Sequence, residues 1–250
     1  LGETGTKVEF TSNLDISVDQ DTRTVIVSSN SKKISTSQIK VSGGSLIDWN
    51  FIVKKGVFLG YQKYEGSRAS QFGLTGCITF HDIKLVALKI TVNQSKCEDA
   101  IHFVRAHGDI EKISINRSSF DALDADFSKL NFNIFNISNA GNDCIDFSAG
   151  IYWINDMSFK NCGDKGLSAG ENSIVNLLKA EISKALIGLV AKDGSIVTVK
   201  DTKLTDVDVC LAAYRKKQEF DGGLLEINKI ECKSKKYFMQ SGSFINMPSN

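Results

Sequence analysis

The sequence predicts an all-β fold, a right-handed parallel β-helix with three short strands in each coil of about 20–24 residues. Three observations support this prediction: apolar residues recur at that spacing, opposite charges coincide at the same spacing, and proline is nearly absent. The 250-residue chain has one proline, Pro248. Because proline cannot donate a ladder hydrogen bond, a chain of continuously paired strands has few places for it.

Apolar positions return regularly through the middle of the chain. The triplet Asp-Phe-Ser occurs at 126–128 and again at 146–148. Aligning these triplets gives one expected apolar column with spacings of 24, 20, 20, 22 and 22, formed by Phe103, Phe127, Phe147, Leu167, Leu189 and Leu211. The segment GENSIVNL (170–177) also matches KDGSIVTV (192–199) at a shift of 22. A repeat of this period without a fixed consensus is typical of a solenoid.

Charged residues support the same shift of 22. This shift aligns three charged residues with residues of opposite charge. The pairs are Lys179 with Asp201, Glu181 with Lys203, and Lys184 with Asp206. Opposite charges on neighbouring strands contribute about 0.2–1 kcal/mol per pair. Each coil is expected to contain three strands, as in CIDFS (144–148), IYWIN (151–155) and MSFKN (157–161).

The predicted organisation has three parts. Residues 1–44 form an N-terminal cap or irregular first coils, residues 45–235 form the β-helix, and residues 236–250 close its C-terminal end. A long loop is expected at 60–73. The opening LGETGT lacks an initial Met, and we expect the sequence to be a segment of a longer parent polypeptide.

Composition argues against two classes of partner. The 30 basic and 29 acidic residues nearly cancel, and no basic stripe predicts nucleic-acid binding. No run of about 18 apolar residues predicts a membrane span. The sequence therefore predicts neither a nucleic-acid partner nor a transmembrane segment.

The six cysteines are expected to be small core residues without disulfide bonds. In the expected columns Cys144 shares a position with Cys210, and Cys162 shares one with Cys232. Each pair is three coils apart, or roughly 14 Å at the strand spacing, beyond the Cα reach of a disulfide. No spacing suggests a zinc site. Unpaired cysteines are compatible with a reducing compartment.

Several segments resemble a known superfamily: LTGCITFHD, SKCEDAIHF, GNDCIDFSAG, GDKGLSAGE and KKQEFDGG. Residues 70–235 resemble a β-helix segment of the pectate-lyase-like superfamily, and most closely uncharacterised segments of larger bacterial surface or polysaccharide-associated proteins. The resemblance implies a polysaccharide or glycan partner and an extracellular or cell-surface location. The sequence departs from the enzymes of that superfamily, because it lacks the Arg-x-Pro pattern of pectate lyases, the NTD, DD and GHG signatures of polygalacturonases and the DPHE pattern of alginate epimerases.

Candidate functional residues lie at outward positions of the expected coils. The candidate catalytic residues are His102, Asp126, Asp146, Lys192, Tyr214 and Arg215. The candidate substrate-binding residues are Ser128, Ser148, Ser168, Glu171, Tyr214 and Arg215. Asp126 and Asp146 can hold Ca²⁺ or bind sugar hydroxyls. A Lys, Arg or Tyr beside a metal-neutralised uronate can abstract its C5 proton, whereas two carboxylates about 5 Å apart suit a retaining glycosidase.

Two functions fit these features. The first is a carbohydrate-directed module that binds, and can also cleave or epimerise, an acidic polysaccharide. The second is a non-catalytic scaffold or homo-oligomerisation domain within a larger surface or polymer-synthesising protein, since no known catalytic signature is present. Acidic and hydroxyl ladders also arise without function, because outward positions need polar groups and Asp and Ser satisfy turn amides.

Overall fold

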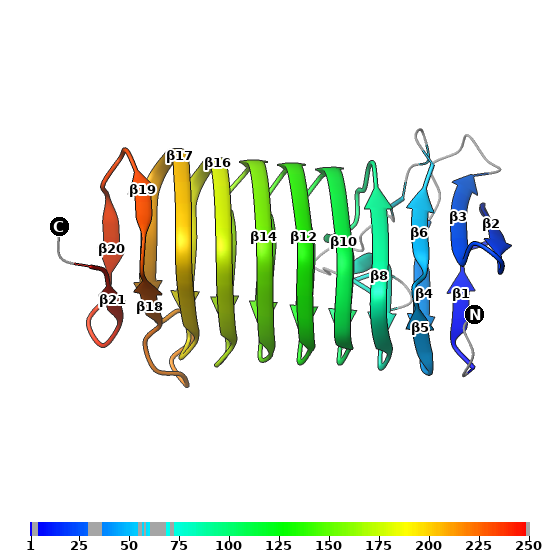
Figure 1. Ribbon diagram of the computed structural model, residues 1–250, viewed down its shortest axis with the longest axis horizontal. Coiled ribbons are helices and arrows are strands. Elements are labelled where there is room, and N and C mark those ends of the chain that lie inside the picture. Colours follow the sequence, from blue (N-terminus) through cyan, green and yellow to red (C-terminus); the bar gives the residue numbers. More distant parts are fainter. Residues whose placement is uncertain are drawn as a thin grey trace.

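The computed structural model describes residues 1, 5–29, 37–54, 57, 59–60, 69–70 and 73–248. Every regular element in these residues is a β-strand, and pairing that is parallel except at the N-terminal end joins the strands into one continuous stack. The strands lie side by side along one long axis, with the two termini at opposite ends (Figure 1). The predicted all-β parallel solenoid is confirmed. Most of the loop expected at 60–73 lies outside the described residues.

The central coils repeat every 22 residues, as the pairing of His107 with Lys129 and of Lys129 with Ile151 shows. Each coil has a short strand followed by a long one whose pairing is interrupted near its middle, at Glu111, Asn133 and Asn155. The interruption divides the long strand into two sides, so that each coil has the three sides expected from sequence. The strands of this region are β7 (Gly76–His81), β8 (Lys84–Val92), β9 (Asp99–Val104), β10 (His107–Ser118), β11 (Asp121–Asp126), β12 (Lys129–Ala140), β13 (Ile145–Ser148), β14 (Ile151–Cys162), β15 (Lys165–Gly170), β16 (Ile174–Lys192) and β17 (Ile196–Tyr214).

The alignment of the two Asp-Phe-Ser triplets is wrong by two residues. The structure pairs Ala125, not Phe127, with both Phe103 and Phe147. Phe127 instead lies at the turn after β11, with a φ of 52° and 61% of its surface exposed. The short strands β9, β11 and β13 pair at a shift of 22, so Asp124 rather than Asp126 lies between His102 and Asp146.

The later part of the expected register is confirmed. Leu167, Leu189 and Leu211 pair in succession, although Leu167 follows Ile145 rather than Phe147. Lys179 pairs with Asp201, and Glu181 with Lys203. Opposite charges therefore lie on neighbouring strands at these positions, as predicted.

Aromatic side chains fill the interior of the first central coils. Phe80 and Phe103 stack with ring centroids 5.2 Å apart, and Phe147 stacks on Tyr152 at 4.0 Å. The Tyr152 hydroxyl donates a hydrogen bond to the Ala125 carbonyl at 2.7 Å, which satisfies its polar end inside the core. These contacts hold the short strands from within, while their outward side chains remain available.

The prediction that the cysteines are unpaired is wrong. All six form disulfides, in the pairs Cys77 with Cys97, Cys144 with Cys162, and Cys210 with Cys232. The Cα atoms of Cys144 and Cys162 are 5.3 Å apart. Each bond links the two ends of roughly one coil, 18 to 22 residues apart in sequence, instead of crossing between distant coils. The sequence argument compared only cysteines of one column and overlooked that winding brings the beginning and end of a coil together.

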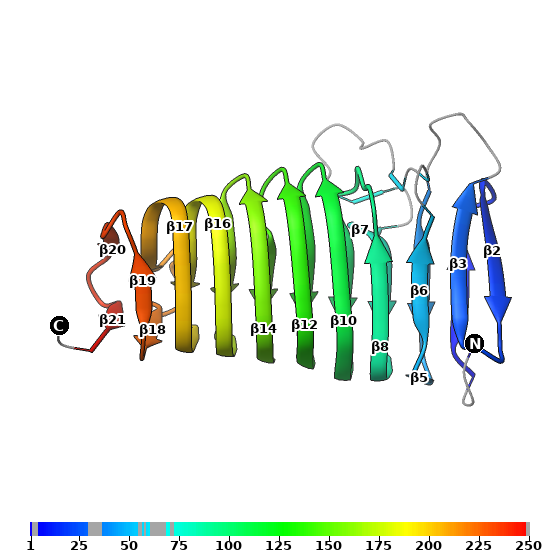
Figure 2. The same cartoon turned by 45° about the horizontal axis from the view of Figure 1, so that its top comes forward.

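The two ends of the stack are built differently. At the N-terminal end β1 pairs antiparallel with β4, and β2 with β3, while β3 also pairs in parallel with β6. These strands are β1 (Lys7–Phe10), β2 (Leu14–Asp19), β3 (Thr24–Ser29), β4 (Ile39–Ser42), β5 (Ser45–Ile47) and β6 (Asn50–Val53). The C-terminal strands are short, namely β18 (Leu224–Ile227), β19 (Ile230–Cys232), β20 (Tyr237–Met239) and β21 (Phe244–Asn246). Their order along the stack is visible when the molecule is turned (Figure 2).

Among the described residues, the structure contains no helix long and apolar enough to cross a membrane.

Candidate functional site

The candidate site lies on the outward side of the short strands β9, β11, β13 and β15. Pairing at a shift of 22 places four polar side chains in one line, which we call the outer file: His102, Asp124, Asp146 and Ser168. Two residues further along each strand, Asp126 pairs with Ser148, and Ser148 with Gly170. Alternation along a strand explains why these positions face outward while Ile145 and Phe147 are buried.

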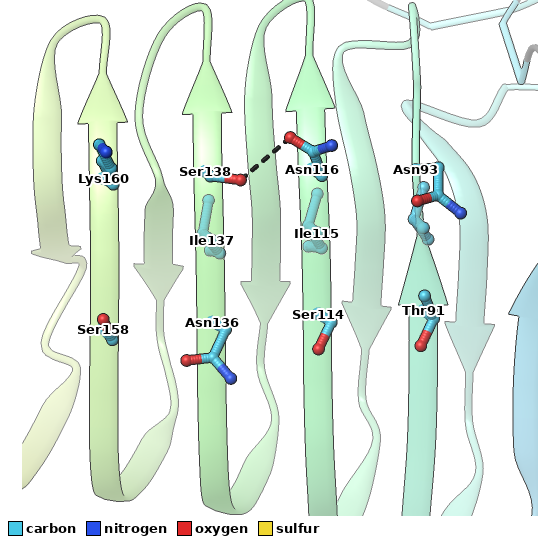
Figure 3. Close-up of a pocket in the computed structure, with 11 residues that line it drawn as sticks. Thr91, Asn93, Ser114, Ile115, Asn116, Asn136, Ile137, Ser138, Ser158 and Lys160 are labelled. Carbon is cyan, nitrogen blue, oxygen red and sulfur yellow. Dashed lines mark hydrogen bonds between the residues drawn. The ribbon is translucent and has the colours of Figure 1, made fainter. Parts of the chain in front are cut away.

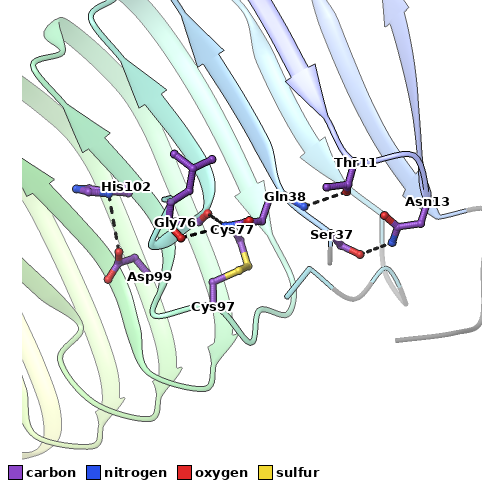
Figure 4. Close-up of a disulfide and its surroundings, with 10 residues drawn as sticks. Thr11, Asn13, Ser37, Gln38, Gly76, Cys77, Cys97, Asp99 and His102 are labelled. Atoms are coloured by element: carbon purple, nitrogen blue, oxygen red, sulfur yellow. Dashed lines mark hydrogen bonds and ion pairs between the residues drawn. A yellow bond between two sulfur atoms is a disulfide. The ribbon is translucent and has the colours of Figure 1, made fainter. Parts of the chain in front are cut away.

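His102 is held between two groups of oxygen atoms. Its Nε2 lies 3.0 Å from Oδ2 of Asp126. On the opposite edge of the ring, Nδ1 lies 2.9 Å from the Thr75 hydroxyl and 3.9 Å from Oδ2 of Asp99. Figure 4 shows Asp99 facing His102, close to the disulfide between Cys77 and Cys97. The predicted contact between His102 and Asp126 is therefore present, with Asp99 as an additional carboxylate.

Asp124 completes a compact group with His102 and Asp126. One ligand atom from each of the three residues lies within 4.8 Å of the other two. Burial raises the pKa of Asp124 well above its usual value, and the negative charges of Asp99 and Asp126 raise it further. Both effects disfavour the charged form of the Asp124 carboxyl, and in its protonated form the group can donate a hydrogen bond.

A second column of acids runs beside the outer file at the start of the short strands. It consists of Asp99, Asp121 and Asp143, all almost fully buried. Burial raises the pKa of Asp99 to about 7 and that of Asp143 to about 7. Asp121 is also raised in pKa by burial, although its Oδ1 accepts hydrogen bonds from the Asp143 amide at 2.8 Å and the Asn142 side chain at 2.7 Å.

Lys165 ends this acidic column on its C-terminal side. Its Nζ lies 3.2 Å from Oδ1 of Asp143 and also contacts Asp164. Burial lowers the pKa of Lys165, but the charges of Asp143 and Asp164 outweigh burial and raise it above the usual value. The ammonium group therefore remains charged and is committed to these two carboxylates.

Asp146 is paired with Lys192, which belongs to a strand two coils further along. The Lys192 Nζ lies 3.3 Å from each carboxylate oxygen of Asp146. A Cβ atom placed on Gly170 would lie 2.8 Å from Cε of Lys192, so the glycine leaves room for the lysine stem to cross the intervening coil. The predicted catalytic pair of Asp126 and Asp146 is thus divided: Asp126 contacts His102, whereas Asp146 contacts Lys192.

The basic residues of the candidate site lie at its C-terminal end. Tyr214 pairs with Lys192, and its ring makes an edge contact with Phe238. Lys217 forms an ion pair with Glu171. The turn that carries Arg215 and Lys217 is anchored by buried Asp193, whose Oδ1 accepts a hydrogen bond from the Lys217 amide at 2.7 Å. The Arg215 amide is held in turn by the side chain of Gln240, at 2.8 Å.

The three predicted serines have different environments. Ser128 is buried, and its hydroxyl bonds to the Ala106 amide and the Asp126 carbonyl, so that it supports the turn. Ser148 is partly buried and pairs with Asp126. Ser168 belongs to the outer file, but it is fully buried and its hydroxyl has no hydrogen-bond partner in the described part of the chain. Only Ser148 is therefore placed to reach a ligand directly.

Sequence reasoning missed Asp124, Asp99 and the exposed Phe127. The shift of 22, already evident between 170–177 and 192–199, would have placed Asp124 between His102 and Asp146. No comparable signal identifies Asp99, because alternation along β9 does not predict a contact between residues three apart.

A different face of the molecule carries a shallow groove. It measures about 310 Å³ and runs across β8, β10, β12 and β14. Its lining is rich in amides and hydroxyls, including Asn116, whose Oδ1 accepts a hydrogen bond from Ser138 at 3.0 Å (Figure 3). Asn136 and Lys160 extend the polar lining. The groove contains no acidic residue and differs in this respect from the outer file.

Comparison with known proteins finds no matching family model, no matching curated protein and no matching solved structure. The fold and the site therefore define a class, a parallel β-solenoid with an acidic outward face. Three disulfides formed by all six cysteines indicate that the chain folds in an oxidising environment, outside the reducing cytosol. The expectation that the cysteines suit a reducing compartment is corrected accordingly.

Proposed function

We propose that the protein is a carbohydrate-directed module that binds an acidic polysaccharide along the outward face of β9, β11, β13 and β15. The observation that carries the proposal is the outer file, in which polar side chains repeat at equivalent positions of successive coils. A linear, repeating array suits a repeating ligand better than a single small molecule. The pectate-lyase-like resemblance and the extracellular or cell-surface location belong to the same proposal.

The two ends of the face offer complementary chemistry for such a polymer. Asp126 and Asp146 can accept hydrogen bonds from sugar hydroxyls, and a protonated Asp124 can donate one. Towards the C-terminal end, Lys192, Arg215 and Lys217 provide positive charge for uronate carboxylates. Phe127 presents an exposed ring beside Asp126 on which a sugar ring can pack.

Processing of the bound polymer would use the acids next to His102. A carboxyl of raised pKa beside an ionised carboxylate is the arrangement that glycosidases use for a general acid and its partner. Asp124 and Asp126 would fill these two roles, and His102 would hold Asp126 in position. Lys192 is a poorer candidate for a base that abstracts a proton, because its charge is engaged by Asp146.

A scaffold or oligomerisation domain is the second candidate function. The observation that favours it is the exposed apolar surface of the C-terminal strands, formed by Tyr237, Phe238, Met239, Phe244 and Met247. Exposed apolar groups gathered at one end of a solenoid are typical of a surface that contacts another unit.

Binding to a panel of uronic-acid polymers and neutral glycans tests the first proposal. We expect Asp146→Asn to weaken binding at least tenfold, because the amide no longer holds the Lys192 ammonium in place and is a weaker hydrogen-bond acceptor for sugar hydroxyls than the carboxylate. Asp156→Asn, an exposed acid on β14, is the matched control and should bind as the wild type does. Ultraviolet absorbance of unsaturated products and reducing-end release would report lyase and hydrolase activity separately.

The outcomes separate the two faces and the two functions. Binding that is lost in Asn136→Ala but kept in Asp146→Asn would place the ligand in the groove of Figure 3 and overturn the proposed site. Absence of binding to every glycan, together with a stable oligomer in sedimentation velocity, would favour the scaffold.

A further inference from the structure

We propose that His102, Asp124 and Asp126 form a binding site for a divalent transition-metal ion of the Zn²⁺ or Mn²⁺ type. The proposal goes beyond polysaccharide binding, because it concerns the protein without any glycan and is tested in that state. It is argued from the spacing of the three side chains, from a buried carboxylate behind His102, and from the chemistry of the ligand set.

The three side chains converge closely enough to share one ion. A ligand atom from each residue lies within 4.8 Å of the others. Two ligands bound to one ion at about 2.1 Å and at a right angle lie about 3.0 Å apart. Nε2 of His102 and Oδ2 of Asp126 are separated by 3.0 Å. A small rotation of the Asp124 carboxyl would bring the third ligand to the same ion.

Asp99 lies behind His102, where an outer partner of a metal-bound histidine is expected. Its side chain is fully buried. The carboxylate faces Nδ1 of His102 at 3.9 Å (Figure 4). Asp126 lies at the other ring nitrogen, Nε2, which leaves that nitrogen for an ion.

The arrangement matches the way proteins orient histidine ligands. A metal-bound histidine usually directs its second ring nitrogen at a carboxylate or another acceptor, which fixes the tautomer and makes the ligating nitrogen more basic. Here Asp99 and the Thr75 hydroxyl lie on the Nδ1 side. With the proton on Nδ1, the lone pair of Nε2 faces Asp126, an acceptor. In that tautomer a cation between these two atoms would supply two coordination bonds, whereas in the other tautomer Nε2–H donates a hydrogen bond to Asp126.

The ligand set favours a transition metal over the Ca²⁺ expected from sequence. Ca²⁺ prefers six to eight oxygen ligands, whereas one imidazole with two carboxylates suits Zn²⁺ or Mn²⁺. Asp146, the other acid of the expected Ca²⁺ site, has both oxygens 3.3 Å from the Lys192 ammonium. Three protein ligands leave coordination positions open on the outward side, where water or a sugar oxygen can bind.

Calorimetric titration of chelator-treated protein with ZnCl₂ and MnCl₂, without glycan, tests the proposal. We expect one ion per chain, and weaker binding of CaCl₂. His102→Gln and Asp124→Asn should each reduce the affinity at least 100-fold. Asp99→Asn should reduce it about 10- to 100-fold, because it alters the orientation of the histidine and not a ligand.

Two matched controls distinguish this site from incidental binding. His107→Gln, on β10, and Asp156→Asn, at an exposed acid on β14, should both keep wild-type affinity. Failure of the wild type to bind either ion at one equivalent would overturn the proposal. An equal loss of metal affinity in His107→Gln and His102→Gln would also overturn the proposal, provided that circular dichroism shows that both variants are folded.

Discussion

The two halves of the outward face share a backbone and differ in chemistry. The first half carries Thr79, His102, Asp124 and Asp146 in successive coils, and the second carries Ser168, Val190 and Ala212. These facing positions follow one another at a shift of 22 from His102 to Ala212. Strand pairing therefore sets the position of each side chain, whereas the chemistry of that side chain decides whether the position belongs to the candidate binding site.

The interior differs between the halves as well. Phe103 and Phe147 face the core behind the acids, whereas the equivalent positions later in the stack are Ala169, Ala191 and Ala213. Disulfides also close coils at both ends of the acidic half, through Cys77 with Cys97 and Cys144 with Cys162. We infer that these cross-links hold the coils that carry mutually repelling carboxylates.

Removing the disulfide beside Asp146 should have the largest effect. We expect the double substitution Cys144→Ala and Cys162→Ala to lower the free energy of unfolding by about 3 kcal/mol, because an 18-residue separation is no longer closed in the unfolded chain. Guanidinium unfolding measures the loss. Replacing Cys210 and Cys232 by alanine is the control: hydrogen exchange should then increase at β18 to β20 and not around Asp146. Equal hydrogen exchange around Asp146 in the two variants would contradict a local role for the disulfide between Cys144 and Cys162.

Raising the pH should selectively weaken the acidic half. The pKa of Asp143 is about 7 in the folded protein and near its usual low value when unfolded, so the folded state binds more protons between these values. Stability therefore falls as the pH rises from about 4 to about 7, and changes little from this group above it. We expect a loss of about 2 kcal/mol between pH 5 and pH 8 in metal-free protein.

Asp143→Asn tests the origin of that pH dependence. The substitution removes one of two acids with a pKa of about 7 and should reduce the slope of the stability profile over the same range, as measured by urea unfolding at each pH, while the contribution of Asp99 remains. Asp156→Asn, which replaces an exposed acid on β14, should leave the slope unchanged. A slope that is the same in Asp143→Asn as in the wild type would refute the assignment.

Breaking the ion pair between Lys192 and Asp146, which joins the two halves of the outward face, should have an intermediate effect on the free energy of unfolding. Lys192→Met keeps the stem over Gly170 but removes the ammonium from Asp146. We expect the free energy of unfolding to fall by about 1 kcal/mol. The ion pair is only partly exposed, and the Asp146 carboxylate can be hydrated once the ammonium is removed. Thermal unfolding at low and high salt measures it. Lys179→Met, at an exposed ion pair with Glu181, should change stability by less.

Phe127→Ser should have the smallest effect on stability and a clear effect on ligand binding. The ring is 61% exposed, so we expect a change of less than about 0.5 kcal/mol in unfolding free energy. If a sugar ring packs on Phe127, affinity for the polymer should fall about fivefold, as measured by titration. Leu178→Ser, an exposed apolar residue elsewhere, is the control and should leave affinity unchanged.

The sequence by itself determined the solenoid. Repeated apolar positions, such as Ile174 with Ile196 and Val175 with Val197, and the coincident charges of Lys179 and Asp201 required stacked coils with a shift of 22. It also placed His102 and Asp146 on one outward face, because alternation along a strand follows directly from the order of residues. These features are local or periodic, and a single chain reveals them.

Only the tertiary structure decided which residues meet. Shifts of 20 and 22 differ by two residues and therefore give the same alternation of inward and outward side chains, so alternation alone could not choose between Asp126 and Asp124 as the neighbour of Asp146. Only the shift of 22 between 170–177 and 192–199 favours Asp124. The hydrogen-bonded pairing of β11 with β13 makes that choice. Closure of each coil likewise brings Cys144 to Cys162, and the fold places Asp99 beside His102, at separations that no linear repeat records.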